Sequence, residues 1–470
     1  MSAAEEFNLE LIFVPGPGIG HIVSAVEFGT LLLSRDSRLS ITFLLINDPV
    51  ARQHTNSTRF HSNPRLRLLN LPELQSESGR SSDELPPVKA VEHVHMHKPL
   101  VREALLTIMS TMNTRAIGFI VDMFCATMLD VADEFSIPTY TFFPSGAGFL
   151  SLVLSMQALT DQNGVDVTEF KGSDHEFAVA GFLNPVPAKV LPSPMLDRKG
   201  SKMINSSARR YRNTRGIFIN TFQELEPIVI QSLSNSIADG IPPIYPVGPL
   251  LNLKSEPQSK FSDTISWLDR QPRDSVVFLC FGSEGSFSEA QIKHLAAALE
   301  SSGRRFLWSL RRRDSSILDD ILPEGFLQRT NGTGKVIEWA PQAAVLSHAA
   351  VGGFVSHCGW NSILESLWFG VPMAAWPIYA EQQVNAFQVV VEMGVAVEIR
   401  MDYRDDDEIF VSSEEIETAI QRLMEGESGV RKRAKEMREK SSRAVMDGGS
   451  SHEFLTTLVH DILHNSIART

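Results

Sequence analysis

The sequence predicts an α/β protein with two doubly wound domains that face each other across a cleft. Three observations predict this fold. The chain has 470 residues, more than one ordinary core accommodates. Short apolar runs alternate with helical stretches along most of it, and a Pro-rich segment interrupts this alternation near the middle. Because the runs are apolar on both faces, they suit parallel strands that helices cover on each side.

The apolar runs occur in both halves of the chain. The first run is followed by a Gly-rich turn and then by a helical stretch at residues 21–33, which is the order of a doubly wound unit. The strands expected in the first half cover residues 11–14, 41–46, 116–121, 139–143 and 216–220. In the second half, strands are expected at 276–281, 305–310, 335–338, 353–356 and 373–376, and helices at 288–301, 361–368 and 382–393.

The Pro-rich segment at residues 241–249 holds four prolines in nine residues. So many prolines fit neither a helix nor a central strand, and they indicate a linker. We therefore predict an N-terminal domain at residues 1–240 and a C-terminal domain at residues 261–450, joined by a linker at residues 241–260. We expect a C-terminal helix at about residues 451–470 to pack back on the first domain.

The composition argues against several classes of protein. A net charge of −13 opposes a nucleic-acid binder, which needs a basic face, and opposes docking on an acidic membrane surface. No apolar run reaches the roughly 18 residues that span a bilayer, and the acidic start of the chain does not resemble a signal peptide. Cys125, Cys280 and Cys358 are far apart and form no CxxC pair, which opposes a disulfide framework or a zinc site. We expect a monomeric, cytoplasmic protein.

Two charged runs have simple interpretations. The three aspartates at residues 405–407 imitate a metal-binding DxD motif, but they lie in a polar stretch far from any expected strand end. The three arginines at residues 311–313 lie at the edge of an expected loop. We interpret both runs as solvated loops, and we expect no metal site.

The most informative stretch is residues 339–382. Within it, the expected strand at 353–356 ends in a tight turn, and a helix is expected to start at Asn361. The first turn of a helix presents free backbone N–H groups and the positive end of the helix dipole, so it binds anions. His357 and Ser362 add hydrogen-bond donors at the same place. Together these groups suit a diphosphate.

Other residues of this stretch suit a nucleoside and a sugar. Trp339 can stack on a base, and Gln342 can hydrogen-bond the edge of that base. Glu365 lies one helical turn further on, where its carboxylate can accept from ribose hydroxyls. Glu381 and Gln382 follow a strand end and open a helix, and they offer an acceptor and an amide to sugar hydroxyls. Any one of these residues could be an ordinary turn or cap residue, but the ordered set is hard to obtain by chance.

A candidate catalytic pair follows two strand ends of the first domain. His21 follows the Gly-rich turn after the first strand, and Asp122 ends the strand expected at 116–121. Because ligands bind at the carboxyl ends of such strands, both side chains are expected to face the cleft. An imidazole can take a proton from an alcohol near neutral pH, and a carboxylate on its other nitrogen fixes the tautomer. Taken alone, His21 could instead cap the following helix, and Asp122 could be an ordinary strand-end residue.

Residues 339–382 closely resemble the plant secondary-product glycosyltransferase box. The matching parts are Trp-Ala-Pro-Gln at 339–342, Ser-His-Cys-Gly-Trp-Asn-Ser at 356–362 and Trp-Pro-Ile-Tyr-Ala-Glu-Gln at 376–382. Nearly the whole chain is similar to plant family 1 UDP-glycosyltransferases, most of all to the group acting on flavonoids, other phenolics and triterpenoids. The resemblance implies a GT-B fold of two Rossmann-like domains. It also implies an inverting O-glycosyl transfer from a UDP-sugar on the C-terminal domain to a small hydrophobic acceptor.

The resemblance implies a role for each matching residue. By this similarity, Trp339 stacks the uracil, while Gln342 and the backbone of Ala340 bind the nucleoside. Glu365 takes the ribose. Gln382, at the end of the box, favours UDP-glucose as the co-substrate, and no metal or other cofactor is implied. The residues implied to hold the diphosphate are Ser283, His357, Asn361 and Ser362, those implied to meet the sugar are Trp360, Glu381 and Gln382, and the implied base and its supporting aspartate are His21 and Asp122.

The acceptor pocket is less defined by the sequence. Candidates are large apolar or aromatic residues near expected strand ends, namely Phe124, Phe149 and Tyr379, with the segments 95–97 and 185–187. Such a pocket would favour a flat or polycyclic hydrophobic acceptor. Phe124 and Phe149 could equally belong to the core.

Two other functions are compatible with parts of the sequence. The Gly-rich turn imitates the fingerprint of NAD-dependent oxidoreductases, but His21 stands at its final glycine position. Such an enzyme also needs an acidic residue at a strand end to hold the ribose, and neither Asp36 nor Asp48 is convincingly placed there. A non-catalytic sugar-nucleotide-binding protein of the same fold is the other alternative, which a turnover assay would separate from an enzyme.

Overall fold

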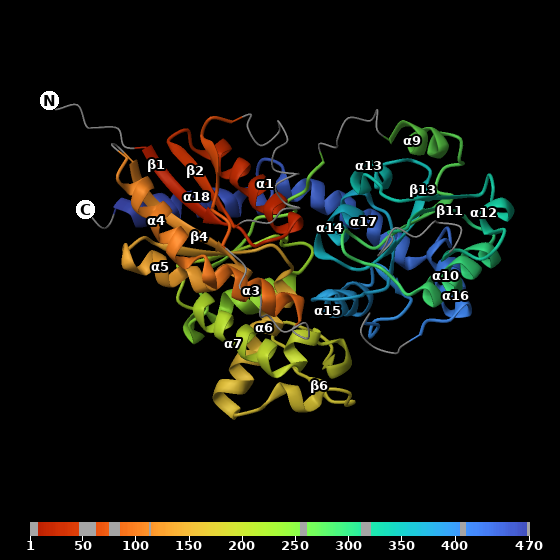
Figure 1. Ribbon diagram of the computed structural model, residues 1–470, viewed down its shortest axis with the longest axis horizontal. Helices are drawn as coiled ribbons and strands as arrows, with labels where there is room; N and C mark the ends of the chain where they lie inside the picture. Colours follow the sequence, from red (N-terminus) through yellow and green to blue (C-terminus); the bar gives the residue numbers. More distant parts are fainter. Residues whose placement is uncertain are drawn as a thin grey trace.

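The computed structural model describes residues 8–46, 63–74, 85–111, 114–253, 261–311, 321–404 and 410–467. Several residues discussed above lie outside the described ranges. They are the aspartates at 405–407, Arg312, Arg313, Asp48 and residues 254–260 of the expected linker. The described chain forms two lobes that lie side by side, each built on a parallel sheet (Figure 1). The predicted doubly wound α/β class is confirmed.

The first lobe contains a seven-stranded sheet in the order β3-β2-β1-β4-β5-β8-β9, with every ladder parallel. Its central strands are buried along nearly their whole length, which explains their continuous apolar sequence. The strands are β1 (Asn8–Val14), β2 (Leu39–Leu45), β3 (Leu66–Asn70), β4 (Thr114–Asp122), β5 (Thr139–Phe143), β8 (Ile217–Ile219) and β9 (Ile244–Pro246). A separate antiparallel pair is formed by β6 (Glu176–Phe177) and β7 (Val186–Pro187).

The second lobe contains a six-stranded parallel sheet in the order β12-β11-β10-β13-β14-β15. The order runs outward in both directions from the β10/β13 pair, as in a doubly wound sheet, so a ligand is expected beyond the carboxyl ends of these two strands. The strands are β10 (Val276–Cys280), β11 (Arg305–Ser309), β12 (Gly334–Ile337), β13 (Val351–Ser356), β14 (Met373–Ala375) and β15 (Ala396–Glu398).

Helices cover both faces of each sheet (Figure 1). Those of the first lobe are α1 (Ile19–Arg35), α3 (Pro86–Met96), α4 (Lys98–Met109), α5 (Leu129–Glu134), α6 (Ala147–Asn163), α7 (Arg198–Tyr211) and α8 (Pro227–Asn235). Those that follow in the chain are α9 (Ser262–Asp269), α10 (Glu289–Ser302), α12 (Phe326–Arg329), α13 (Gln342–Leu346), α14 (Trp360–Phe369), α15 (Gln382–Phe387), α16 (Ser413–Leu423), α17 (Gly429–Val445) and α18 (Ser450–Ile467). Short 3-10 turns include Met123–Met128, directly after β4.

The last helix, α18, returns to the first lobe (Figure 1). Its apolar residues Leu455, Leu458 and Ile462 join the core that β1 and α1 also form. The Tyr245 hydroxyl on β9 donates to Asp461 on α18 at 2.6 Å. The C-terminal helix thus ties the end of the chain to the first sheet.

The structure corrects the interpretation of the Pro-rich segment. Ile244–Pro246 is not a linker but β9, the edge strand of the first sheet, parallel to β8. An edge strand tolerates proline because one of its sides needs no N–H donors. The first sheet therefore extends beyond residue 240.

Two further strands of the parallel sheets and one irregularity were not expected from the apolar runs. β3 is a half-exposed edge strand interrupted by Arg67, and β15 is only three residues long, so neither forms a clear run. The helix expected at 382–393 is α15 followed by a π-helical turn, Gln388–Glu392. Such turns often occur near functional sites.

Candidate active site

The residues that follow the strand ends of the two sheets meet in one cleft. The Asn361 side-chain amide, at the start of α14, donates to the Gly20 carbonyl at the start of α1 (3.4 Å). The Ser24 hydroxyl on α1 donates back to the Asn361 side-chain oxygen (3.3 Å). Groups that follow β1 and β13 are therefore in direct contact across the two lobes.

His21 and Asp122 form the predicted pair. His21 lies in the first turn of α1 and Asp122 is the last residue of β4, and the His21 Nδ1 atom lies 2.9 Å from Asp122 Oδ2. Asp122 is fully buried, and its other oxygen accepts from the Phe124 backbone N–H at 3.0 Å. His21 is 24% exposed, so one edge of the ring can reach a ligand. The aspartate thus holds the imidazole in one orientation.

The Gly-rich turn is shaped by this pair. A Cβ atom at Gly16 would lie 2.5 Å from Asp122 Oδ1 and 3.0 Å from His21 Nδ1. Only glycine leaves room there for the two side chains to meet. The turn therefore has a packing role at the His21–Asp122 pair rather than the dinucleotide-binding role that its spacing imitates.

The charge of the surroundings sets the protonation of His21. Burial lowers the pKa of His21, but the charge of Asp122, the hydrogen bond with it and the smaller effect of Glu381 outweigh burial, so the pKa lies above its ordinary value. Glu381 comes from the other lobe, and the Ser145 hydroxyl donates to its Oε1 at 3.5 Å. A carboxylate of the second lobe thus lies near the imidazole of the first.

Trp339 presents a free aromatic face. It follows β12, is 48% exposed, and its ring lies 4.9 Å from that of Phe261, tilted by 40°. An exposed indole next to a second ring is suited to stacking on a base. The neighbouring Ala340 is buried at 5% exposure, so only its backbone is offered to a ligand. Phe261 was not singled out from the sequence.

Gln342 connects two other predicted donor-site residues. Its Nε2 atom donates to Ser362 Oγ at 2.9 Å and to Glu365 Oε2 at 2.8 Å. Burial raises the pKa of Glu365 to about 7, against the opposing effect of this hydrogen bond. A ligand hydroxyl that donates to Glu365 would favour its ionised form.

His357 lies at the turn between β13 and α14. It is 6% exposed, and burial lowers its pKa to about 4, so the ring is neutral at physiological pH. Its Nδ1 atom is buried and makes no hydrogen bond with the described residues. A Cβ at Gly282 or Gly359 would lie 2.5 or 2.6 Å from His357 Nε2, so two glycines clear the space around this ring. Ser283 follows Gly282 and is exposed.

Trp360 is placed differently from expectation. Its side chain is 3% exposed, its ring packs on Gly146, and its indole N–H donates to the Asn220 carbonyl at 2.6 Å. The indole is therefore a contact between the lobes and does not face open space. Because Trp360 begins α14, what it can offer to a sugar or phosphate is its backbone N–H.

The side-chain oxygen of Gln382 is already used in hydrogen bonds within the protein. Its Oε1 atom accepts from the backbone N–H groups of Ile378 (2.9 Å) and Tyr379 (3.1 Å), and the residue is 3% exposed. These bonds fix the turn before α15, in which Ala380 has φ +57°. They leave the Gln382 NH₂ group as the end that can serve a sugar hydroxyl.

An apolar cavity lies beside the His21–Asp122 pair. Phe124 and Phe149 both line it, and the Phe124 ring centroid is 5.0 Å from that of His21. Glu381 lies at one side. Its volume is about 60 Å³, so an acceptor of several rings must also occupy the cleft or displace side chains. The further lining residues, which the sequence did not indicate, include Pro87, Val91, Met203, Ile204, Ser207 and Tyr211.

Three acceptor candidates do not line this cavity. Tyr379 packs with the core of the second lobe, and the segment 185–187 belongs to the antiparallel β6/β7 pair. Residues 95–97 form the junction of α3 and α4 rather than a loop, and His97 is fully buried. Instead, the cavity is lined by other residues of α3 and by α7, whose inward faces become apparent only when these helices pack together.

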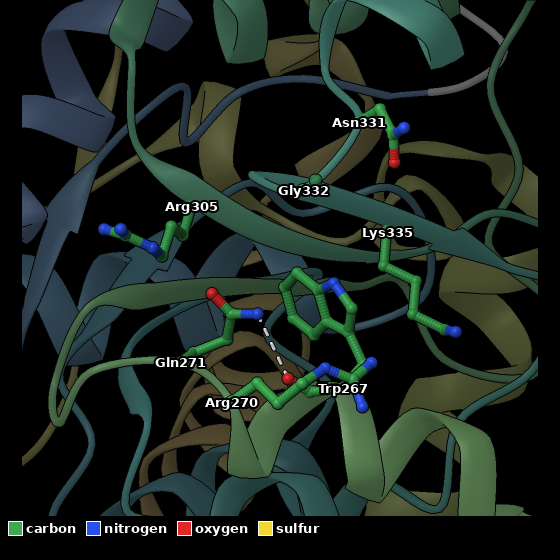
Figure 2. Close-up of a pocket in the computed structure, with 8 residues that line it drawn as sticks. Trp267, Arg270, Gln271, Arg305, Asn331, Gly332 and Lys335 are labelled. Carbon is green, nitrogen blue, oxygen red and sulfur yellow. Dashed lines mark hydrogen bonds between the residues drawn. The ribbon is translucent and has the colours of Figure 1, made fainter.

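Another hollow of about 550 Å³ lies at the amino ends of β11 and β12. Figure 2 shows Arg305 and Lys335 extending in opposite directions around it, with Trp267 between them. It contains none of the predicted site residues and is at the end of the sheet opposite the carboxyl ends that bear them. We therefore assign the site to the cleft.

Three further features concern the whole described chain. Cys125, Cys280 and Cys358 are all free and buried. Within the ranges that the structure describes, no group of three or more His, Cys, Asp or Glu side chains is arranged to hold a metal ion. Among the described helices, none combines the length and the hydropathy needed to cross a membrane.

Comparisons with known proteins agree with this geometry. A model of the family described as "UDP-glucoronosyl and UDP-glucosyl transferase" matches residues 243–435. UDP-glycosyltransferase 71A15 from Malus domestica is 52% identical and covers 96% of this chain and 99% of its own length. The chain belongs to the plant UDP-glycosyltransferase family. A second relative, putative UDP-glucose flavonoid 3-O-glucosyltransferase 3 from Fragaria ananassa, is 48% identical and covers 96% of this UDP-glycosyltransferase and 99% of its own length.

Solved structures share the fold of this UDP-glycosyltransferase. A UGT transferase from Siraitia grosvenorii in complex with UDP superposes with a TM-score of 0.87 at 43% identity, covering 97% of this chain and 100% of that one. UGT71G1 from Medicago truncatula, complexed with UDP-glucose, superposes with a TM-score of 0.87 at 42% identity, covering 97% and 98%. The predicted family, GT-B fold and enzyme class are confirmed, whereas the roles of the individual residues stay predictions.

Proposed function

We propose that this UDP-glycosyltransferase is an inverting O-glucosyltransferase. It would move glucose from UDP-glucose to a hydroxyl of a small hydrophobic acceptor such as a flavonoid, another phenolic or a triterpenoid. The observation that carries the proposal is the His21–Asp122 pair, which lies between an apolar cavity and Glu381 of the other lobe. Relatives named as a flavonoid 3-O-glucosyltransferase and an anthocyanidin 3-O-glucosyltransferase, and a similar structure holding UDP-glucose, support the choice of substrates.

The reaction follows from the orientation of His21. Because Nδ1 faces Asp122, Nε2 is the atom that takes the proton from the acceptor hydroxyl. The acceptor oxygen then attacks the anomeric carbon from the face opposite UDP, and the bond between that carbon and the phosphate oxygen breaks. The electron pair of this bond leaves with UDP, and the α-linked donor gives a β-glucoside. No covalent enzyme intermediate is needed, and Asp122 stabilises the imidazolium that forms.

The donor would lie along the ends of the second sheet. Trp339 would stack on the uracil, and Glu365 would accept from the ribose hydroxyls. The diphosphate would lie at the start of α14, where backbone N–H groups, the Ser362 hydroxyl and a neutral His357 are gathered. These groups would stabilise the negative charge on leaving UDP, so we propose that no metal ion is required.

The glucosyl group would lie between Glu381 and the NH₂ group of Gln382. The test compares initial rates with UDP-glucose, UDP-galactose and UDP-xylose against a panel of phenolics and triterpenoids, with the product read by mass spectrometry and proton NMR. We expect UDP-glucose to be preferred and the product to be β-linked. A clear preference for UDP-galactose or an α-linked product would contradict the proposal.

A further inference from the structure

The start of α6 is held by the second lobe at several points. Ser145 contacts Glu381, and the ring of Trp360 packs on Gly146, so that a Cβ there would lie 2.6 Å from it. α15 lies against α6 between the two lobes (Figure 1). The segment that enters α6 is therefore seated on elements that carry the predicted sugar site.

A buried carboxylate completes this contact. Glu226, 3% exposed, accepts from the backbone N–H groups of Ala147 (2.8 Å) and Gly148 (2.7 Å) in the first turn of α6. Its Oε1 atom also accepts from Gln388 Nε2 of the second lobe at 3.1 Å. Burial raises the pKa of Glu226, whereas these donors and the helix N-terminus favour the ionised form. One carboxylate thus holds a helix of one lobe and a side chain of the other.

The approach of Gln388 requires a glycine on α6. A Cβ at position 148 would lie 1.8 Å from Gln388 Nε2 and 2.5 Å from its Cδ. Gln388 itself is 1% exposed and begins the π-helical turn that continues α15. The side chain therefore lies directly against the first turn of α6, and any larger residue at 148 would push it away.

The two elements joined by Glu226 carry predicted residues for the two substrates of the proposed reaction, the acceptor and the sugar donor. α6 carries Phe149, which lines the apolar cavity, and α15 begins with Gln382 after its N-cap Glu381. We propose that Glu226, through Gln388, is a positioning residue that sets the acceptor cavity on α6 against the sugar-binding start of α15. This inference rests on the proposed function for the identity of the two substrates.

The physical reason is the sensitivity of a displacement reaction to placement. The acceptor oxygen and the anomeric carbon are held by different lobes, and a misplacement of about 1 Å can cost roughly 100-fold in rate. UDP itself would lie within the second lobe, so its affinity does not depend on this contact. Loss of the contact should therefore slow transfer without weakening UDP binding.

The experiment uses two variants of the full-length enzyme. Gln388→Met keeps the volume and the Glu226 bonds to α6 but removes the bond from Gln388 to Glu226, while Glu226→Gln disturbs both sets of bonds. We expect Gln388→Met to lower kcat with UDP-glucose and a phenolic acceptor by roughly 10-fold, and Glu226→Gln by roughly 10- to 100-fold. The Kd of UDP from calorimetry should stay within about twofold of the unchanged enzyme, since the UDP site is intact.

A matched control is available in the same π-helical turn, Gln388–Glu392. Glu392 also accepts from backbone N–H groups of the first lobe, those of Leu183 (2.8 Å) and Asn184 (3.0 Å), but at the exposed surface away from the cavity. Glu392→Gln should leave kcat within about twofold, because exposed contacts contribute little. The positioning role would be overturned if Gln388→Met kept the kcat of the unchanged enzyme. It would also be overturned if both variants lost UDP affinity by the same factor as kcat.

A readout independent of turnover separates this inference from the proposed function. Hydrogen exchange of backbone amides should increase in Gln388→Met both at the start of α6 and in α15 with the turn that continues it. The reason is that Gln388 no longer ties this turn to Glu226, which accepts from the first N–H groups of α6. Increased exchange confined to one of the two helices would overturn the inference. If the unchanged enzyme transfers glucose to no acceptor, the proposed function fails, and the exchange result still decides whether the two helices are coupled.

Discussion

At the scale of single residues, two predicted site residues each use one polar atom for a hydrogen bond within the protein and leave the other polar atom for a ligand. His21 gives one ring nitrogen to Asp122, and Gln382 gives its oxygen to two backbone N–H groups. In each case the hydrogen bond to the occupied atom fixes the direction of the free one. The sequence predicted both as site residues, but it could not show which atom of each is left for a ligand.

The first prediction concerns the protonation of His21. The base must be neutral, so kcat/KM for the acceptor should be high above the pKa of His21 and fall as the pH drops through it. Asp122 raises that pKa, so Asp122→Asn should move this acidic limb to lower pH and also lower the plateau rate. Glu381→Gln should move the limb in the same direction but less. The measurement is the pH profile of kcat/KM, and an unmoved limb in Asp122→Asn would contradict the account.

The second prediction concerns Glu365. Its pKa of about 7 in the free protein means that it is partly protonated at neutral pH, and donation from ribose hydroxyls favours the carboxylate. UDP affinity should therefore rise with pH, by roughly tenfold between about pH 6 and about pH 8 if the bound form is fully ionised. Calorimetry on Glu365→Gln is the control, because this variant keeps only the titration of the nucleotide itself. The same pH dependence in both proteins would exclude Glu365 from the ribose site.

At the scale of elements, the start of α14 is the centre of the proposed donor site. Three features meet there: the turn after β13, the first N–H groups of the helix, and a neutral histidine with a buried, unused nitrogen. The alternation of apolar runs and helical stretches along the sequence was enough to predict β13 and this helix. They were not enough for β3, β9 and β15, because short or half-exposed edge strands lack a continuous apolar run.

The third prediction follows from α14. If the helix start and His357 stabilise the leaving diphosphate, turnover should be unchanged within about twofold by EDTA. Exchange into chelator-treated buffer, followed by rates with and without added manganese or magnesium, is the measurement. Activity that disappears with EDTA and returns with manganese would show that the helix start is not sufficient.

At the scale of the whole molecule, the site exists only because the two lobes are in contact. Trp360 was expected to meet the sugar from its place in the box, yet its indole is used to join the lobes through Asn220. Phe261 and the α7 residues of the cavity were missed for a related reason. Their roles depend on how distant elements pack together, and a single sequence gives no signal for that packing. The residues that follow strand ends could be predicted, because topology alone brings them to the cleft.

The most direct test of the central claim is the turnover of His21→Ala with UDP-glucose and a weakly acidic hydroxyl acceptor. The claim is that His21, held by Asp122, is the general base for a donor bound in the other lobe. The account predicts that kcat falls by about 10²–10⁴-fold, the usual effect of losing a positioned base, while the Kd of UDP is retained. An acceptor with an acidic phenol should lose less rate, since it ionises more readily. Near-normal turnover of the weakly acidic acceptor in His21→Ala would contradict the account.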